Sequence, residues 1–351
     1  MNKIIIPTVI FFLLTSCSLN SKSKFWTSEK KIEVEKNLKI NEVFKKDKVF
    51  EKEINSSLKI KISDRLKKNS FINNFDNNNG RTNYKGTLRK SSRFKFSKID
   101  NFDFSEPEIA FDEKNLIFFD NKGSILKFDN TSKLIWKRNF YKKFEKKSKP
   151  LLSFANNKKI LIVTDNIGKF YAVDIATGEL LWEKKNISPF NSQIKIYKDK
   201  FFAIDFDNAL SCYSINDGSK VWQFKTQESL IKSQKKLSLL IIDDKVFFNN
   251  SLGDISAVDI ETGNMLWQKP TRSSSLYEDS FSLKTSDLIG SKNLILFSNN
   301  KNEFYSLDIR TGHLNWKQKI NSNLRPTLIG ELIFTISMEG FLLVVNKENG
   351  N

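Results

Sequence analysis

The sequence predicts an all-β protein, a β-propeller built from four-stranded blades. A unit ending in tryptophan recurs, and Trp136, Trp182, Trp222, Trp267 and Trp316 follow one another at spacings of 46, 40, 45 and 49 residues. Each unit contains apolar runs of strand length separated by Asn, Asp and Gly, which is typical of strands and tight turns and not of helices. Four short strands in a repeat of this length correspond to one propeller blade.

The first residues predict export. Ile4–Leu14 is an apolar run after a basic start, too short to cross a bilayer as a helix but suited to a signal peptide. The following Leu-Thr-Ser-Cys resembles the bacterial lipobox, which implies acylation of Cys17 and anchoring through buried acyl chains. By the same resemblance, Ser18 implies sorting to the outer membrane. We therefore expect residues 1–17 to be a lipoprotein signal peptide and the protein to lie on the periplasmic face of the outer membrane. The alternative, a generic signal peptide with an accidental cysteine, would also export the chain.

Residues 18–84 are expected to form a basic, largely disordered tether. Between residues 18 and 100 there are 22 Lys and Arg against 10 Asp and Glu, so most of the chain's formal charge of +18 lies there. Such a composition does not favour a packed core. Because an exported protein does not meet chromosomal DNA or RNA, we expect no nucleic-acid partner. Residues 85–351 are assigned to the propeller.

The composition also limits the chemistry. His313 is the one histidine, and Cys17 and Cys212 are the two cysteines, so a zinc site of Cys/His type, an iron–sulfur cluster or a disulfide framework cannot be assembled. Cys212 lies in an alternating run and is expected to be a small buried strand residue. We predict no catalytic residue, no metal site and no cofactor.

Each part of the repeat has a physical role, as residues 170–182 illustrate. Phe170–Asp174 alternates as a strand does, and Asp174 and Gly178 provide turn chemistry, because Asp accepts backbone N–H bonds and Gly supplies a positive φ. A second strand then carries Trp182, whose ring is large enough to cover the seam to the neighbouring blade. Since the pattern repeats five times, we interpret it as architecture and not as a ligand-binding or catalytic motif. The repeated positions are Trp136; Asp174, Gly178 and Trp182; Gly218 and Trp222; Asp259, Gly263 and Trp267; Asp308, Gly312 and Trp316.

Two further strands precede each hairpin. Ile160–Thr164 is an example of the nearer one, and Ser192–Ile196 is an example of the inner one. The sequence thus contains five complete units and a partial sixth that begins at Leu324, whose tryptophan would fall after Asn351. Two explanations remain: the chain is a fragment of a larger, eight-bladed ring, or a six-bladed ring closes with residues 93–97 as the missing outer strand.

The consensus Ala-x-Asp-x-x-Thr-Gly-x-x-x-Trp, found in Ala172–Trp182 and Ala257–Trp267, resembles the repeat of the PQQ-like propeller superfamily over roughly residues 100 to 351. That superfamily includes quinoprotein alcohol dehydrogenases, which carry PQQ and Ca²⁺ and commonly an adjacent Cys-Cys pair, and BamB-like outer-membrane lipoproteins. This chain has no Cys-Cys pair and no carboxylate cluster apart from the turn Asp residues. A lipobox followed by a bare propeller is more similar to the BamB-like family.

This resemblance implies a non-enzymatic scaffold of the outer-membrane β-barrel assembly (BAM) machinery, a monomer within a complex that binds the POTRA domains of a BamA-like protein. Two alternatives remain open: a PQQ-dependent dehydrogenase-like quinoprotein, and a propeller lipoprotein with another binding role in the envelope. BamB-like proteins contact BamA partly through a Leu-x-Leu-Arg-like element between blades. The nearest stretch here holds Leu230, Ile231 and Lys232; it lacks the Arg and the following Gly, so an ordinary connecting loop is the alternative.

A second candidate surface is basic. Residues 137–149 contain seven Lys and Arg in thirteen positions. The segment is interpreted either as a solvated loop or as a surface attracted to anionic lipid or to an acidic partner.

Overall fold

The computed structural model describes residues 59–60, 108–228, 235–271, 285–291 and 293–351. All of them belong to the compact unit Val49–Asn351. The predicted signal peptide with Cys17, the tether apart from residues 59–60, and Leu230, Ile231 and Lys232 lie outside the described residues.

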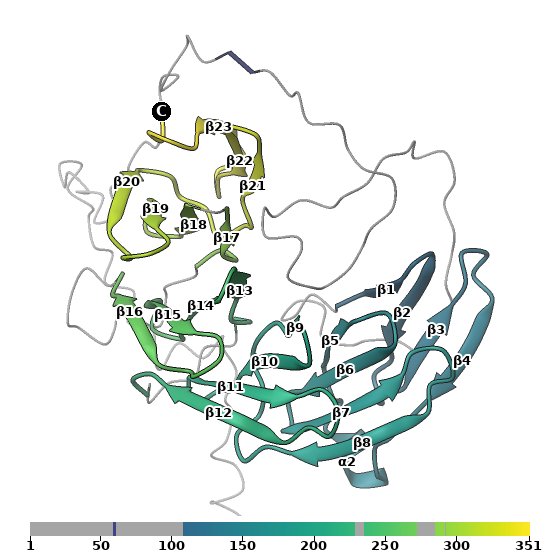
Figure 1. The fold of residues 1–351 in the computed structure, drawn as a ribbon. Helices are drawn as coiled ribbons and strands as arrows, with labels where there is room; N and C mark the ends of the chain where they lie inside the picture. Colours follow the sequence, from purple (N-terminus) through teal and green to yellow (C-terminus); the bar gives the residue numbers. More distant parts are fainter. Residues whose placement is uncertain (1–58, 61–107, 229–234, 272–284, 292) are drawn as a thin grey trace, which may run out of the picture. The chain divides into compact units, whose positions relative to one another are not determined.

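The described chain forms six antiparallel sheets, each a meander in which strands pair in chain order (Figure 1). Five have four strands and the sixth has three, so the predicted all-β fold of five complete blades and a partial sixth is confirmed. We number these sheets as blades one to six. Their strands are β1 (Ala110–Asp112), β2 (Asn115–Phe119), β3 (Ile125–Phe128) and β4 (Leu134–Arg138); β5 (Leu152–Asn156), β6 (Ile160–Asp165), β7 (Lys169–Asp174) and β8 (Leu180–Lys185); β9 (Lys195–Tyr197), β10 (Lys200–Ile204), β11 (Ala209–Ser214) and β12 (Lys220–Lys225); β13 (Leu239–Ile242), β14 (Lys245–Asn249), β15 (Ile255–Asp259) and β16 (Met265–Lys269); β17 (Ile289–Gly290), β18 (Leu294–Asn299), β19 (Glu303–Asp308) and β20 (Leu314–Gln318); β21 (Thr327–Ile329), β22 (Leu332–Ile336) and β23 (Leu342–Asn346).

One short helix interrupts this pattern in the described part of the chain. Helix α2 (Lys143–Lys147) lies in the connection from β4 to β5. The basic segment 137–149 is therefore not simply a loop, because it includes the end of β4 as well as α2. No helix within the described residues has the length and apolar character needed to span a membrane.

The middle strands are buried on both faces. The sequence suggested alternation in Phe170–Asp174, yet β7 is buried at every position except its last. The reason is that each blade packs against a neighbour on either side, so both faces of its central strands enter a core. Cys212 on β11 is fully buried in this way, and burial raises the pKa of its thiol to about 12.

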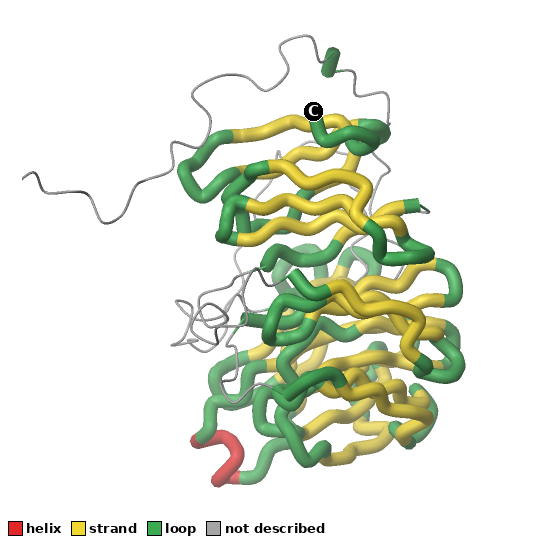
Figure 2. The backbone as a smooth tube through the Cα atoms, turned by 90° about the vertical axis from the view of Figure 1, so that its left-hand side faces the viewer, coloured by secondary structure: helices red, strands yellow, loops and turns green. Residues whose placement is uncertain are grey.

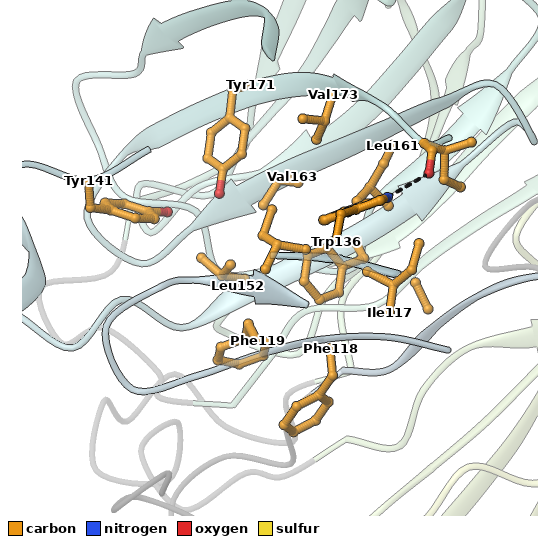
Figure 3. Packing of buried hydrophobic residues seen from close by; sticks show 14 residues of the cluster. Ile117, Phe118, Phe119, Trp136, Tyr141, Leu152, Leu161, Val163, Tyr171 and Val173 are labelled. Atoms are coloured by element: carbon orange, nitrogen blue, oxygen red, sulfur yellow. Dashed lines mark hydrogen bonds between the residues drawn. The ribbon is translucent and has the colours of Figure 1, made fainter. Parts of the chain in front are cut away.

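One hydrophobic cluster fills each junction between successive blades. The cluster between blades one and two, shown in Figure 3, joins Phe118 and Phe119 of β2 to Leu161 and Val163 of β6. Four further clusters fill the junctions from blades two and three to blades five and six. The core is thus divided into layers that alternate with the sheets. Figure 2 shows the backbones of these stacked sheets.

The outermost strands differ from the others. On β4 and β16 the tryptophan is the buried residue, and the two residues before it are exposed. A register shift between the third and fourth strand recurs in blades one to five, for example between Ala257 and Val258. In blade four it leaves Leu266 as the extra residue, because Val258 pairs with Met265 and Ala257 pairs with Trp267.

Candidate functional sites: blade joints, an inter-blade connector and a polar inner surface

The repeated tryptophans form a joint between each blade and the next. The indole Nε1–H of Trp182 donates a hydrogen bond of 2.8 Å to the carbonyl oxygen of Ile215, which follows the third strand of blade three. The ring also lies against the turn glycine of that blade, Gly218. In the other joints the indole Nε1–H donates to a backbone carbonyl oxygen in the same way: Trp136 to Ile175 (3.2 Å, dashed in Figure 3), Trp222 to Ile260 (3.2 Å), Trp267 to Ile309 (3.2 Å) and Trp316 to Lys347 (2.9 Å).

The turn that receives the ring is organised by its aspartate. In blade four, Asp259 Oδ1 accepts hydrogen bonds from the Thr262 amide and hydroxyl, both at 2.8 Å, and from the Glu261 amide at 3.1 Å. The bonds from Thr262 lower the pKa of the Asp259 carboxyl. Asp174 and Asp308 accept the same set of bonds in blades two and five.

Glycine is required at the end of this turn for two reasons. Gly263 has φ +73°, a region that residues with a side chain rarely adopt, and a Cβ placed on it would lie 2.6 Å from the Trp222 ring. Gly178, Gly218, Gly312 and Gly350 combine a positive φ with the same close approach to a tryptophan of the preceding blade.

Two turns depart from the consensus, and the one in blade one is also one residue shorter, since the Ser132 amide donates to the Asp129 carbonyl at 3.1 Å. Blade three has Ser214 in place of the first aspartate, and Asp217 takes over by accepting the Ser219 amide at 3.1 Å and its hydroxyl at 2.8 Å. These bonds from Ser219 lower the pKa of Asp217 to about 2. Blade one has Ser132 at φ +69° instead of glycine.

The connector that contains the predicted partner-binding residues is held at both ends. Before it, Asn208 Nδ2 donates to the Gln227 carbonyl at 3.0 Å, and the Thr226 amide donates to the Asn208 carbonyl at 3.2 Å. After it, Lys236 pairs with Glu108 and donates to Ser153 Oγ at 2.7 Å. Leu230, Ile231 and Lys232 thus belong to a connector that starts at the outer strand of blade three and ends beside the inner strand of blade four.

Polar side chains near the inner strands bridge blades that are far apart in sequence. Glu108 precedes blade one, accepts the Phe154 amide of blade two at 2.8 Å and pairs with Lys236 of blade four. Asp287, at the start of blade five, accepts Gln193 Nε2 at 2.9 Å and Arg325 Nε at 2.8 Å.

We define the inner polar surface as the side chains of Glu108, Ser153, Gln193, Lys195, Lys236, Asp287 and Arg325. Five of its members occupy the same position in the repeat, two residues before the inner-strand residue that lies in register with the tryptophan position: Glu108, Ser153, Gln193, Asp287 and Arg325. Sequence reasoning missed it because the residue type at this position differs from blade to blade.

Lys195 on β9 is the chemically unusual member. Burial, together with the nearby positive charge of Arg325, lowers the pKa of its ammonium to about 8, against the opposing effect of Asp287 and Glu108. Clustered cations of this kind attract anionic groups. Among the described residues there is no group of three or more His, Cys, Asp and Glu side chains that could hold a metal ion.

Comparison with known proteins places this architecture in a family. Residues 121–351 match the family model described as outer membrane protein assembly factor BamB. The crystal structure of BamB from Moraxella catarrhalis is similar, with a TM-score of 0.59 and 18% identity over 70% of this chain and 73% of that one. A computationally designed protein, Ika8, gives a TM-score of 0.56 and 16% identity over 68% of this chain and 70% of its own. A europium-containing methanol dehydrogenase gives 0.48 and 17%, over 60% of this chain and 50% of its own. No match was found among curated protein sequences. At these identities the BamB and Ika8 structures show a shared fold.

Proposed function

The chain belongs to the family of the outer membrane protein assembly factor BamB, and from this premise we propose that it is a non-enzymatic scaffold of the outer-membrane β-barrel assembly machinery. Its partner would be a BamA-like protein, contacted through that protein's periplasmic POTRA domains. The single observation that carries the proposal is the family match over residues 121–351, because a propeller fold alone does not specify a function.

The anchored connector between blades three and four supports a role in binding. Its ends are fixed by hydrogen bonds of Asn208 and Thr226 on one side and of Lys236 on the other. Anchoring the ends of a binding segment lowers the entropy lost on binding. We propose Leu230, Ile231 and Lys232 as partner contacts on these grounds.

The proposed location is the periplasmic face of the outer membrane, with Cys17 as the lipid-bearing residue. The Leu-Thr-Ser-Cys sequence supports this proposal. Radiolabelled palmitate is expected to enter the full chain and not a Cys17→Ala variant. Equal labelling of the two proteins would contradict the assignment of Cys17.

The scaffold role is tested by affinity purification of the full chain from envelope extract, with identification of what co-purifies. We expect a BamA-like protein in the eluate and a loss of at least about 10-fold in its yield with the triple variant Leu230→Ser, Ile231→Ser, Lys232→Glu, which corresponds to about 1.4 kcal/mol of binding free energy. The matched control is Ile187→Ser, since Ile187 is fully exposed (104%) in the connector between blades two and three.

Two results would contradict the proposal at different points. Absence of a BamA-like protein from the wild-type eluate would reject the scaffold role itself. An equal loss with the triple variant and with Ile187→Ser would reject the assignment of the binding residues. Dye-linked alcohol oxidation by the purified chain supplied with PQQ and Ca²⁺ would instead support the quinoprotein alternative.

A further inference from the structure

Helix α2 presents an exposed aromatic residue among lysines. Phe144 is 64% exposed, and Lys142, Lys143 and Lys147 beside it are also exposed, with Lys146 partly so. Figure 2 shows α2, in red, projecting beyond the strands at one edge of the propeller. The basic character anticipated for residues 137–149 is therefore concentrated at a protruding helical turn.

The one carboxylate of this segment is turned inward. Glu145 is 4% exposed, and its Oε2 accepts the Lys142 amide at 2.7 Å. Its two oxygens also pair with Lys169 at 3.4 Å and Lys185 at 3.3 Å. Burial alone would raise the pKa of Glu145, but the Lys142 amide and the two lysines hold it below its ordinary value. The negative charge of Glu145 is thus compensated by Lys169 and Lys185. The exposed charged side chains of α2 are lysines alone.

The base of this turn is fixed by buried contacts. Lys169 is 2% exposed, donates to the Phe140 carbonyl at 2.7 Å, and lies 4.9 Å from the ring centroid of Tyr141. The Tyr141 hydroxyl donates to Asp165 at 2.6 Å. Both Tyr141 and Asp165 are buried, so α2 is held to blade two by a network that does not involve its outward-facing side chains.

We propose that α2 is a docking point for an anionic lipid surface, with Phe144 entering the interfacial region and Lys142, Lys143, Lys146 and Lys147 contacting the headgroups. An aromatic side chain partitions into the membrane interface, and lysines close to an anionic surface contribute electrostatic attraction. A single projecting turn offers a protein partner little area to bury, whereas stable protein interfaces need roughly 800 Å² on each side. Lipid is therefore the occupant that this geometry fits. The inference does not depend on the scaffold role or on acylation.

A fluorescent reporter at the apex of α2 tests the proposal in the full chain. Phe144→Cys is introduced in a Cys17→Ala background and labelled with an environment-sensitive nitrobenzoxadiazole group; Cys212 is fully buried and does not compete. The labelled chain is mixed with phosphatidylcholine vesicles with and without phosphatidylglycerol. The label at 144 is expected to shift to the blue and to be quenched by nitroxide lipids on the anionic vesicles. Each Lys→Gln change at 142, 143, 146 or 147 is expected to lower the ratio of docked to undocked α2 about 5-fold.

The control label is placed by Phe341→Cys. Phe341 is 52% exposed, like Phe144, but the residues around it, from Met338 to Leu342, include no lysine. It is expected to emit as in water on both kinds of vesicle. The proposal is overturned if the label at 144 stays aqueous on anionic vesicles to which the chain is bound, if the chain does not bind them, or if both labels respond alike. Shielding of position 144 by an added acidic envelope protein but not by lipid would also overturn it, in favour of a protein partner.

Discussion

At the residue scale, the turn glycine and the preceding blade's tryptophan are fitted to one another. Gly263 adopts a positive φ and lets the Trp222 ring approach so closely that no side chain fits between them. Glycine at this place therefore serves both the backbone and the packing.

Gly263→Ala is expected to destabilise the protein by about 2–4 kcal/mol, because it adds a steric clash to an unfavourable backbone conformation. Gly340→Ala is the matched control. Gly340 also has a positive φ, of +91°, but nothing lies within 4 Å of the position of its Cβ, so about 1 kcal/mol is expected from the backbone alone. Urea unfolding of both variants measures the difference. Equal losses would show that ring contact contributes nothing.

Lys195 makes a prediction about pH. The pKa of Lys195 is about 8 in the folded chain, against an ordinary value of 10.5. Below pH 8 the ammonium is therefore charged in both the folded and the unfolded protein, and the folded protein carries the whole desolvation cost of that charge. Between pH 8 and 10.5 the unfolded state binds more protons, and the contribution of Lys195 becomes less unfavourable as pH rises. Lys195→Met is therefore expected to raise the free energy of unfolding at pH 7 by about 1–3 kcal/mol, and this gain is expected to shrink towards pH 10.

The measurement is urea unfolding of wild type and variant across this pH range. Lys184→Met is the control, since Lys184 is exposed on β8, and a change within about 0.5 kcal/mol is expected. A gain from Lys195→Met that stays constant with pH would show that the buried charge is not its cause.

At the scale of the element, the outermost strand of blades one and four combines exposed residues with one buried tryptophan. The register shift against the third strand separates an exposed residue from the tryptophan that follows it, as Leu266 (46% exposed) and Trp267 (9%) show in blade four. Without the extra residue, a strand of this length would place neighbouring side chains in strict alternation. The strand thereby fixes one large side chain over the next blade.

Replacing Trp267 in two steps separates its two contributions. Trp267→Phe keeps an aromatic ring but removes the Nε1–H donated to Ile309 at 3.2 Å, and a loss of about 1 kcal/mol in unfolding free energy is expected. Trp267→Ala removes the ring as well and is expected to cost about 3–5 kcal/mol. Leu266→Ser, at the adjacent exposed position, is expected to stay within about 0.5 kcal/mol. If Trp267→Phe were as unstable as Trp267→Ala, the assignment of most of the stabilisation to the ring would be contradicted.

At the scale of the whole molecule, contacts of two kinds join the blades. The hydrophobic clusters and the tryptophan joints link blades that follow one another in the chain. The inner polar surface, in contrast, links blades one and four through Glu108 and Lys236. Their side chains are 19% and 34% exposed, so water screens the pair only partly. Such a contact ties together residues 128 positions apart.

A double-mutant cycle of Glu108→Gln and Lys236→Met is expected to give a coupling energy of about 0.5–2 kcal/mol in urea unfolding. The control cycle uses Glu331→Gln and Lys347→Met. That ion pair lies within blade six, with Glu331 60% exposed, and its coupling is expected to be below about 0.5 kcal/mol. Similar couplings in both cycles would show that the long-range pair has no special part in holding the blades together.

The repeat made the fold predictable, because every unit carries the same residues for the same local reasons. Asp259, Thr262 and Gly263 specify their turn through bonds within five residues, and the recurring tryptophan indicates the outer strand. The burial of β7 on both faces could not be deduced from alternation along a single strand. It follows from stacking each blade between two neighbours.

The sequence by itself determined the blade, its turns and the partial sixth unit, since each of these depends on residues close together in the chain. The tertiary structure alone decided that Glu145 of α2 turns inward, that Lys195 is half-buried near Arg325, and that Glu108 meets Lys236. The physical reason is distance along the chain. These contacts join residues from different blades or from the connection between β4 and β5, and their energies exist only after the blades have packed together.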